Sequence, residues 1–278
     1  MNHKQHSIHK LPMKIISAVL AALIVFSTGM ISCYAQGLGV FDKMETEEIL
    51  SDYADEIIDT DGVRSVDTEH SGENELYLNM KDGSTTVYAF AEPVLYTDDN
   101  GKLRFKDNAI VKQENKEKAD LGYDYSNTQN GYEIHISSDS AKGVLAEYGD
   151  ISFSINPIAE NASKGAVSKE EKNGKEYENF EYPDVFGKGA SLKYFLQLNG
   201  IKEEVILDQN INQNKFSFLL TTTNCTPVLN EDGSISLLDQ NEEEVQRFTA
   251  PFGDEEYKSS SFNFTNKVSY MAANKYLI

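Results

Sequence analysis

Few side chains in this chain could act as nucleophiles, general bases or metal ligands at neutral pH. The sequence holds five histidines, two cysteines and no tryptophan. Three of the histidines (His3, His6 and His9) fall in the first 35 residues, which leaves His70 and His135 in the remainder. A Ser/His/Asp or Cys/His arrangement would need one of these two imidazoles as its base.

Neither His135 nor Cys225 has neighbours that indicate a reactive site. His135 alternates with apolar residues in the run 132–136, so we expect it to point outward from a strand. Cys225 follows the apolar run 216–220, and nothing near it indicates a lowered thiol pKa. It is predicted to be a structural cysteine near a strand end. Zinc-ligand spacing is absent, and we expect no catalytic residue, no metal and no cofactor.

The carboxylates do not single out a site either. Glycoside hydrolysis needs two acids in a shared cleft, one with a raised pKa, and 45 acidic residues make some close pair inevitable. The acidic runs 59–62 and 98–101 invite a calcium-loop interpretation, but His70 and Ala109 stand where the closing glutamate belongs. We expect both runs to be turns. The segment 187–189 (GKG) lacks the third glycine of a nucleotide-binding loop.

The first 35 residues have the order of an export signal. Lys4, Lys10 and Lys14 lie in a head without acids, followed by the apolar run 15–26 and a softer exit of small residues at 27–35.

This pattern favours a signal peptide over residues 1–35, cleaved after Ala35 to leave Gln36 as the first mature residue. A retained single-span anchor is an alternative, although residues 15–31 are at the short end of the roughly 17–25 needed to cross a bilayer. Lipidation at Cys33 is a second alternative, because residues 30–33 approximate a lipoprotein box.

The net negative charge of the chain limits the kinds of partner that it can bind. The net charge is −20, and removal of residues 1–35 removes three lysines and no acid, which leaves 22 basic against 45 acidic residues and a charge of −23. Nucleic-acid binding requires a basic footprint, so no nucleic-acid partner is expected. Contact with a membrane is expected only through the signal segment. Cleavage would leave Cys225 alone, so no disulfide within the chain is expected.

The remainder is predicted to be mainly β. Residues 44–58 have apolar positions at helical spacing and predict one short helix after the signal, within an acidic lead segment over 36–70. From about Glu75 the apolar period becomes two. Turn pairs separate the alternating runs at Asp82-Gly83, Asn100-Gly101, Asn130-Gly131, Asn199-Gly200 and Asp232-Gly233. Such spacing indicates antiparallel sheets arranged as a β-sandwich over residues 71–278.

Two local expectations follow from the same alternation. Residues 159–176 are polar and without apolar period, and predict either a mobile loop between two lobes (71–158 and 177–278) or a long hairpin excursion within one sandwich. In the run 201–207, we expect Lys202, Glu203 and Glu204 on the solvent side, with Ile201, Val205 and Leu207 buried.

A resemblance to a known family rests on several stretches in order. They are residues 182–186 (YPDVF), 192–194 (LKY), 199–207 (NGIKEEVIL), 216–218 (FSF), 232–235 (DGSI) and 250–252 (APF). Over about residues 177–254 the chain resembles the N-terminal β region of large secreted Gram-positive wall-associated proteins with YD (RHS-type) repeats, which often carry a DNRLRE module next. Residues 92–94 and 143–155 fit more loosely.

The resemblance implies a secreted or surface role, with toxin delivery or adhesion further along the polypeptide, and it carries over no catalytic residue. After Phe252 the pattern ends and no YD repeat follows, so a truncated product, a fragment and a stand-alone relative all stay open.

We therefore expect an exported, non-enzymatic β domain of a bacterial cell-surface or secreted protein, acting as a scaffold or interaction module. A module that binds carbohydrate or cell-wall polymer is the alternative, and exposed Tyr or Phe clustered on one sheet face would favour it. A secreted hydrolase is the third hypothesis. We expect a wall polymer or another surface protein as the partner, and the sequence leaves its identity and the oligomeric state open.

Overall fold

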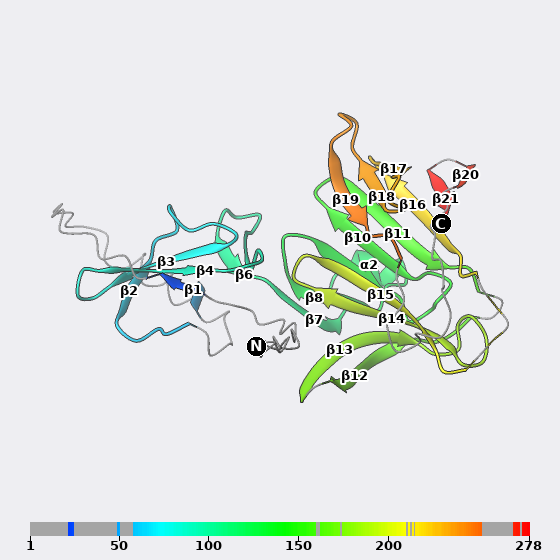
Figure 1. Cartoon of the computed structure of the whole chain (residues 1–278), viewed down its shortest axis with the longest axis horizontal. Helices are drawn as coiled ribbons and strands as arrows, with labels where there is room; N and C mark the ends of the chain where they lie inside the picture. Colours follow the sequence, from blue (N-terminus) through cyan, green and yellow to red (C-terminus); the bar gives the residue numbers. More distant parts are fainter. Residues whose placement is uncertain are drawn as a thin grey trace, which may run out of the picture. The chain divides into compact units, whose positions relative to one another are not determined.

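The computed structural model describes residues 22–24, 49–50, 58–159, 162–172, 174–209, 211, 213, 215–251, 269–272 and 274–278. The chain divides into two compact units, Met1–Pro93 and Val94–Ile278. Strands dominate both units (Figure 1). The mainly β, antiparallel fold expected from the turn pairs and the period of two is confirmed.

The first unit is a four-stranded antiparallel sheet in the order β1-β4-β3-β2. Its strands are β1 (Ala22–Ile24), β2 (Val63–Val66), β3 (Glu75–Met80) and β4 (Thr85–Ala89). Leu76 and Leu78 are fully buried on one face of β3, as the alternation predicts. The β3–β4 hairpin turns at Asp82-Gly83, where Gly83 takes a φ of +88° that a side chain would disfavour.

Two predictions for the N-terminal region fall largely outside the described residues. Of the predicted helix over 44–58, the structure describes Ile49 and Leu50, which are helical, and Ile58. Within the predicted signal it describes β1, which pairs with β4. The signal, its cleavage point and the helix as a whole therefore stay predictions.

The second unit is built mainly from two antiparallel sheets. The larger has the order β20-β21-β16-β11-β10-β9-β8-β7, and the smaller the order β12-β13-β14-β15. The strands of the larger sheet are β7 (Asp107–Lys112), β8 (Tyr125–Gln129), β9 (Glu133–Ile136), β10 (Val144–Tyr148), β11 (Ile151–Pro157), β16 (Phe218–Thr223), β20 (Ser269–Ala272) and β21 (Lys275–Leu277). Those of the smaller sheet are β12 (Ala166–Lys172), β13 (Lys175–Tyr182), β14 (Ala190–Gln197) and β15 (Gly200–Leu207).

Shorter elements complete the second unit. The pair β5 (Leu95–Thr97) and β6 (Leu103–Phe105) forms a hairpin, and β17 (Thr226–Leu229), β18 (Ile235–Leu238) and β19 (Glu244–Phe248) form a three-stranded sheet. The helix α2 (Lys116–Asp120) lies between β7 and β8 in the chain. Four of the five predicted turn pairs fall between consecutive strands, and Asn199-Gly200 joins β14 to β15 with Gly200 as the first residue of β15, which confirms the hairpin predictions.

The main core lies between the two large sheets. Ile134 and Ile136 of β9 contribute to the same buried cluster as Phe180 of β13 and Leu192 of β14. Burial of each such side chain stabilises the fold by about 1.5–3 kcal/mol. A second cluster joins Leu220, Cys225, Leu237 and Tyr276 beneath the three-stranded sheet.

The predicted boundaries differ from the observed ones. The chain divides after Pro93 rather than at residue 71, and residues 166–176 belong mostly to the β12–β13 hairpin. Strands β9, β10, β13 and β14 contribute to one buried cluster, an arrangement compatible with a hairpin excursion within one sandwich. The polar sequence of β12 hid the strand from prediction, because Val167 alone among its described side chains packs on that core.

A second correction concerns β15. Glu203 pairs directly with Tyr194, and Val205 with Leu192, both of which are buried in the core. Directly paired residues share a face, so Glu203 lies on the same face as Val205 and not on that of Lys202 and Glu204, although the residue is exposed, as expected. Leu207, expected to be buried, is 40% exposed at the strand end.

Candidate functional site

A close group of titratable side chains lies on the outer face of the eight-stranded sheet. Ile134 and Ile136 of β9 point into the core, so alternation places Glu133 and His135 on the opposite face. Glu147 of β10 pairs directly with Glu133 and lies on that face too. The outward direction predicted for His135 is confirmed.

His135 is buried although it faces away from the core. Only 2% of the residue is exposed. The connection between β7 and β8, which includes α2, provides its neighbours: Gln113 contacts Nδ1, and the Tyr123 ring lies 6.0 Å from the imidazole between ring centroids.

A closed circuit of hydrogen bonds passes through this imidazole. The backbone N–H of Asn115 donates to Gln113 Oε1 at 3.0 Å, which leaves the Gln113 amide nitrogen to donate to His135 Nδ1 at 2.8 Å. With Nδ1 an acceptor, the imidazole proton is assigned to Nε2, which donates to Glu147 Oε2 at 2.9 Å. Lys118 of α2 pairs with the same Glu147 oxygen and returns the circuit to the helix.

The electrostatics agree with a neutral imidazole. Burial is the largest effect and lowers the pKa of His135, while Glu147 and Glu133 raise it and Lys118 lowers it. The pKa of Tyr123 is raised, first by burial and then by Glu147. Asn115 is also the N-cap of α2, accepting from the backbone N–H groups of Glu117 and Lys118, so the circuit and the helix start are one structure.

The same three side chains have the chemistry of a metal site. His135, Glu133 and Glu147 bring their donor atoms within 4.8 Å of one another, and His135 Nε2 lies 3.2 Å from Glu133 Oε2. In this arrangement, however, a proton occupies the Nε2 lone pair and the Lys118 ammonium takes the place of a cation at Glu147. We therefore interpret the cluster as part of a hydrogen-bond circuit that includes an ion pair between Lys118 and Glu147.

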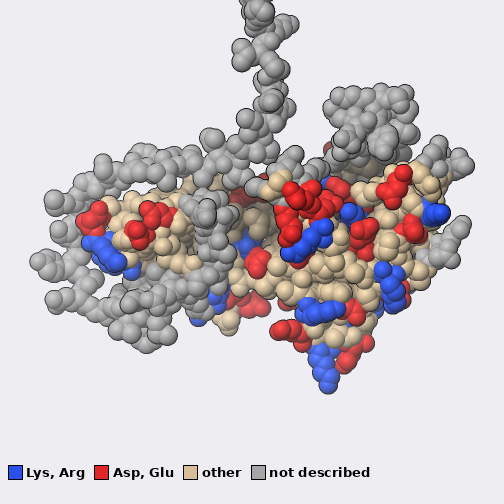
Figure 2. All heavy atoms as spheres, turned by 90° about the horizontal axis from the view of Figure 1, so that it is seen from below, with Lys and Arg blue, Asp and Glu red and all other residues tan. Residues whose placement is uncertain are grey.

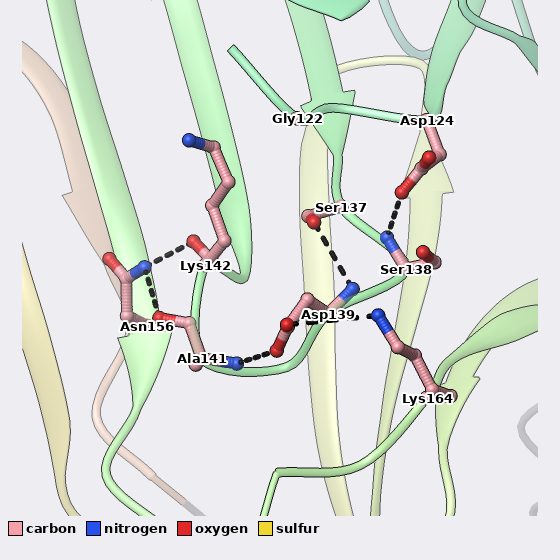
Figure 3. A pocket seen from close by; sticks show the side chains of 9 residues that line it. All are labelled: Gly122, Asp124, Ser137, Ser138, Asp139, Ala141, Lys142, Asn156 and Lys164. Carbon is pink, nitrogen blue, oxygen red and sulfur yellow. Dashed lines mark hydrogen bonds and ion pairs between the residues drawn. The ribbon is translucent and has the colours of Figure 1, made fainter.

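A shallow polar hollow of about 540 Å³ lies nearby (Figure 3). It is lined by Gly122, Asp124, Ser137, Ser138, Asp139, Ala141, Lys142, Asn156 and Lys164. Lys142 Nζ lies 4.7 Å from the centre of the Tyr123 ring, and the same ring lies 6.0 Å from His135 between ring centroids. Tyr123 therefore contacts both a residue of the hollow and a residue of the circuit.

The carboxylates of the hollow are engaged by the chain itself. Asp124 accepts a hydrogen bond of 2.6 Å from the backbone N–H of Ser138, whose hydrogen bond lowers the pKa of Asp124. Asp139 accepts from the N–H of Ala141 at 3.0 Å and lies 3.7 Å from Lys164 Nζ (Figure 3). Glu133 and Glu147 do not line the hollow, so the close acid pair and the hollow are not one cleft.

The other residues singled out in the sequence have structural surroundings. Cys33, Ala35 and Gln36 lie outside the described residues. Cys225 is buried between β16 and β17, and burial raises the pKa of its thiol, which confirms the structural interpretation. His70 is exposed, and its hydrogen bond with Asp67 raises its pKa. Asp59 and Asp98 accept backbone N–H groups two residues on, which confirms the predicted turns.

The sequence did not single out the other members of the circuit or the neighbouring Glu133; those members are Gln113, Asn115, Lys118 and Glu147. Glu133 and His135 stand two apart in a predicted strand, which already places them on one face. The position of α2 over that face cannot be predicted from the local sequence, because α2 is held by contacts with His135 of β9 and Glu147 of β10, which come later in the chain.

Charges of both signs are interspersed on the surface. On the face shown in Figure 2, lysine and arginine side chains lie beside aspartates and glutamates. The ion pairs of the described residues include Lys169 with Glu176 and Lys193 with Glu170. Within the part of the chain that the structure describes, no helix has the length and apolar composition needed to cross a membrane.

Comparisons with known proteins do not assign this chain to a family. No protein-family model matches this chain, and neither curated proteins nor solved structures give a significant match.

Proposed function

We propose that this chain is an exported, non-enzymatic β domain of a bacterial cell-surface or secreted protein, acting as a scaffold or interaction module. The observation that carries the proposal is the use made of the few reactive side chains. Both ring nitrogens of His135 are engaged in holding α2 to the sheet, and the thiol of Cys225 is buried with a raised pKa. These groups stabilise structure rather than face a cleft.

Two features of the sequence support the exported location. The basic head, apolar run and small-residue exit of residues 1–35 are typical of a signal. The resemblance of residues 177–254 to the N-terminal β region of YD-repeat and DNRLRE-containing wall-associated proteins agrees with an exported location. The sandwich formed by the two large sheets is compatible with such a region.

Export is tested by expressing the full chain in a Gram-positive host and measuring the mass of the product in wall and medium fractions. We expect a mature N-terminus at Gln36. Replacing Leu20 with aspartate should keep the chain inside the cell, because the apolar run would be interrupted, whereas Gln5→Glu in the head is the control for an added charge. An acylated N-terminus at Cys33 would contradict cleavage after Ala35, and an intact chain in the membrane would indicate an anchor.

Binding of a wall polymer is the second candidate function, and the hollow in Figure 3 is the observation that favours it. Its hydroxyl, amide, carboxylate and ammonium groups are those that hydrogen-bond a hydroxyl-rich or charged polymer. Exposed aromatic residues clustered on one sheet face would also favour polymer binding. Among the described residues the exposed tyrosines, Tyr148 and Tyr177, lie on different sheets and do not form such a cluster.

Co-sedimentation with purified wall polymer tests this second function. Lys164→Ala should weaken sedimentation if the hollow is the site, while Lys188→Ala, in an exposed turn elsewhere, should not. Equal sedimentation of the two variants would remove the hollow from consideration. Release of new reducing ends from the polymer would contradict the non-enzymatic proposal.

A further inference from the structure

The His135 circuit holds a short helix whose own side chains are not buried. All five residues of α2 lack a buried side chain. Its links to the sheet pass through Gln113 before the helix and Lys118 within it, and both meet at the His135–Glu147 pair. Helical segments this short are unstable alone, so the position of α2 depends on these polar links and on Tyr123, which follows the helix and is buried beside His135.

We infer that His135 is an acid-sensitive latch, whose protonation opens the circuit and releases the 113–123 segment from the outer face of β9 and β10. The inference rests on hydrogen-bond geometry and on the direction in which each group donates.

A second proton can bind the imidazole of His135 only at Nδ1. Nε2 already carries a proton directed at Glu147, so acid adds its proton to Nδ1. Nδ1 then becomes a donor that faces the donor amide nitrogen of Gln113. Rotating the Gln113 amide would present Oε1 to the imidazolium, but Oε1 accepts the backbone N–H of Asn115 and would abandon it. Protonation therefore costs one of the two hydrogen bonds made by Gln113.

Charged groups from each packed element act on the imidazole. Glu133 of β9 and Glu147 of β10 favour the protonated form, and Lys118 of α2 opposes it while neutralising Glu147. Tyr123 contributes a protonated phenol, and β8 contributes the uncharged Ser126 opposite His135. Burial exceeds these effects and keeps the pKa of His135 below its usual value.

The direction of the pH dependence follows. The closed state binds the additional proton less readily than the open state, where the histidine pKa is about 6.5. Closure is therefore complete above about pH 6.5 and is lost as pH falls through the lowered pKa. Each pH unit across this window changes the closed-to-open ratio by about tenfold.

Two measurements on the full chain test the latch. Long-range proton–nitrogen NMR correlation at pH 7.5 should show His135 protonated at Nε2 and bare at Nδ1. Hydrogen exchange, corrected for intrinsic rates, should show the amides of 116–122 losing on the order of tenfold protection per pH unit below about 6.5, while β9 keeps its own. A proton on Nδ1 at pH 7.5, or unchanged protection of α2 down to pH 4.5, would overturn the inference.

Gln113→Glu is the decisive variant because it keeps the shape and replaces the donor by an acceptor. One carboxylate oxygen can accept from Asn115 and the other from imidazolium Nδ1–H, so the variant should retain protection of α2 at pH 5. His70→Asn removes the exposed histidine and should leave the wild-type profile unchanged. If Gln113→Glu loses protection at the same pH as wild type, or if added Zn²⁺ removes the Nε2 proton at pH 7.5, the latch is wrong.

Discussion

The hydroxyl of Tyr182 donates a hydrogen bond of 2.5 Å to the carbonyl oxygen of Ser137, at the point where β13 of the smaller sheet meets the end of β9 in the larger. Both residues are buried. This bond joins the two sheets through polar atoms inside an otherwise apolar core, and burial raises the pKa of the phenol so strongly that it stays a donor.

Tyr182→Phe should therefore destabilise the sandwich by about 1–3 kcal/mol, because it leaves the Ser137 carbonyl buried without this donor while the ring still packs on Phe180. Urea unfolding measures the change. Tyr177→Phe is the matched control, since Tyr177 lies on the same strand with 43% of its surface exposed, and should change stability by less than about 0.5 kcal/mol. Equal stability of the two variants would show that the buried bond contributes nothing.

A second prediction concerns the close approach of backbone to the aromatic core at Gly165. A Cβ placed there would lie 2.6 Å from the Tyr182 ring and closer still to Phe180. Both rings are fully buried and cannot retreat, so Gly165→Ala should cost about 1–3 kcal/mol by overpacking.

The control for this substitution is Gly131→Ala, where the nearest atom would be Tyr96 Cβ at an ordinary 3.5 Å. Thermal unfolding of both variants separates crowding from the general effect of replacing a glycine. A lower melting temperature for Gly131→Ala than for Gly165→Ala would show that the rings around Gly165 adjust.

The strand pattern was predictable where local chemistry sets it. Asp82-Gly83 and Asp232-Gly233 mark hairpins because a turn of that type needs its own residues, and the flanking alternation marks the buried faces. The candidate site was only half predictable. Alternation shows which way His135 points, but not that α2 covers it, because that contact joins segments with no shared local signal.

Misassigned residues have a common physical cause. The alternation of β15 contains an acid, Glu203, at an inward position near a sheet edge, where charge would normally face solvent. The alternation of β12 is hidden because its described side chains are mostly polar on both faces. A pattern rule fails in both places because the edge of a sandwich allows water to reach part of its inner face.

The position of Glu203 predicts a stability change with pH. Desolvation by the surrounding protein raises the pKa of Glu203 from 4.5 to about 7. The residue as a whole is exposed, so water offsets part of this desolvation. The folded state then holds this proton more tightly than the unfolded state, so stability is lost as pH rises from about 4.5 towards 7.

Glu203→Gln should remove this loss and be more stable than wild type at pH 8, while the two are alike at pH 4. Urea midpoints at the two pH values measure the difference. Glu204→Gln, on the opposite face beside Lys202, should show no gain at pH 8, because it removes an ion pair instead. A destabilised Glu203→Gln at pH 8 would mean that the carboxylate is favourably ionised where it stands.

Two turns with the same hydrogen bonds give the last prediction. In the β5–β6 hairpin, Asp98 Oδ1 accepts from the N–H groups of Asn100 and Lys102, each at 2.9 Å. In the β18–β19 hairpin, Asp239 Oδ1 accepts from Asn241 at 2.8 Å and from Glu243 at 2.9 Å. Each aspartate is also bridged through its backbone N–H to the carbonyl of the residue four positions on.

The two turns differ at the residue that takes a positive φ. The first has Gly101 at +77°, whereas the second has Glu242 at +64°, where a side chain costs about 1–2 kcal/mol. Glu242→Gly should therefore raise the stability of the second unit by up to about 1 kcal/mol, after the larger chain entropy of glycine is subtracted. Gly101→Ala, the reciprocal change, should lower it, and differential scanning calorimetry of both variants measures the pair. If Glu242→Gly melts below wild type, the side chain of Glu242 stabilises the turn by more than its backbone strain, because the hydrogen bonds of Asp239 are the same in either case.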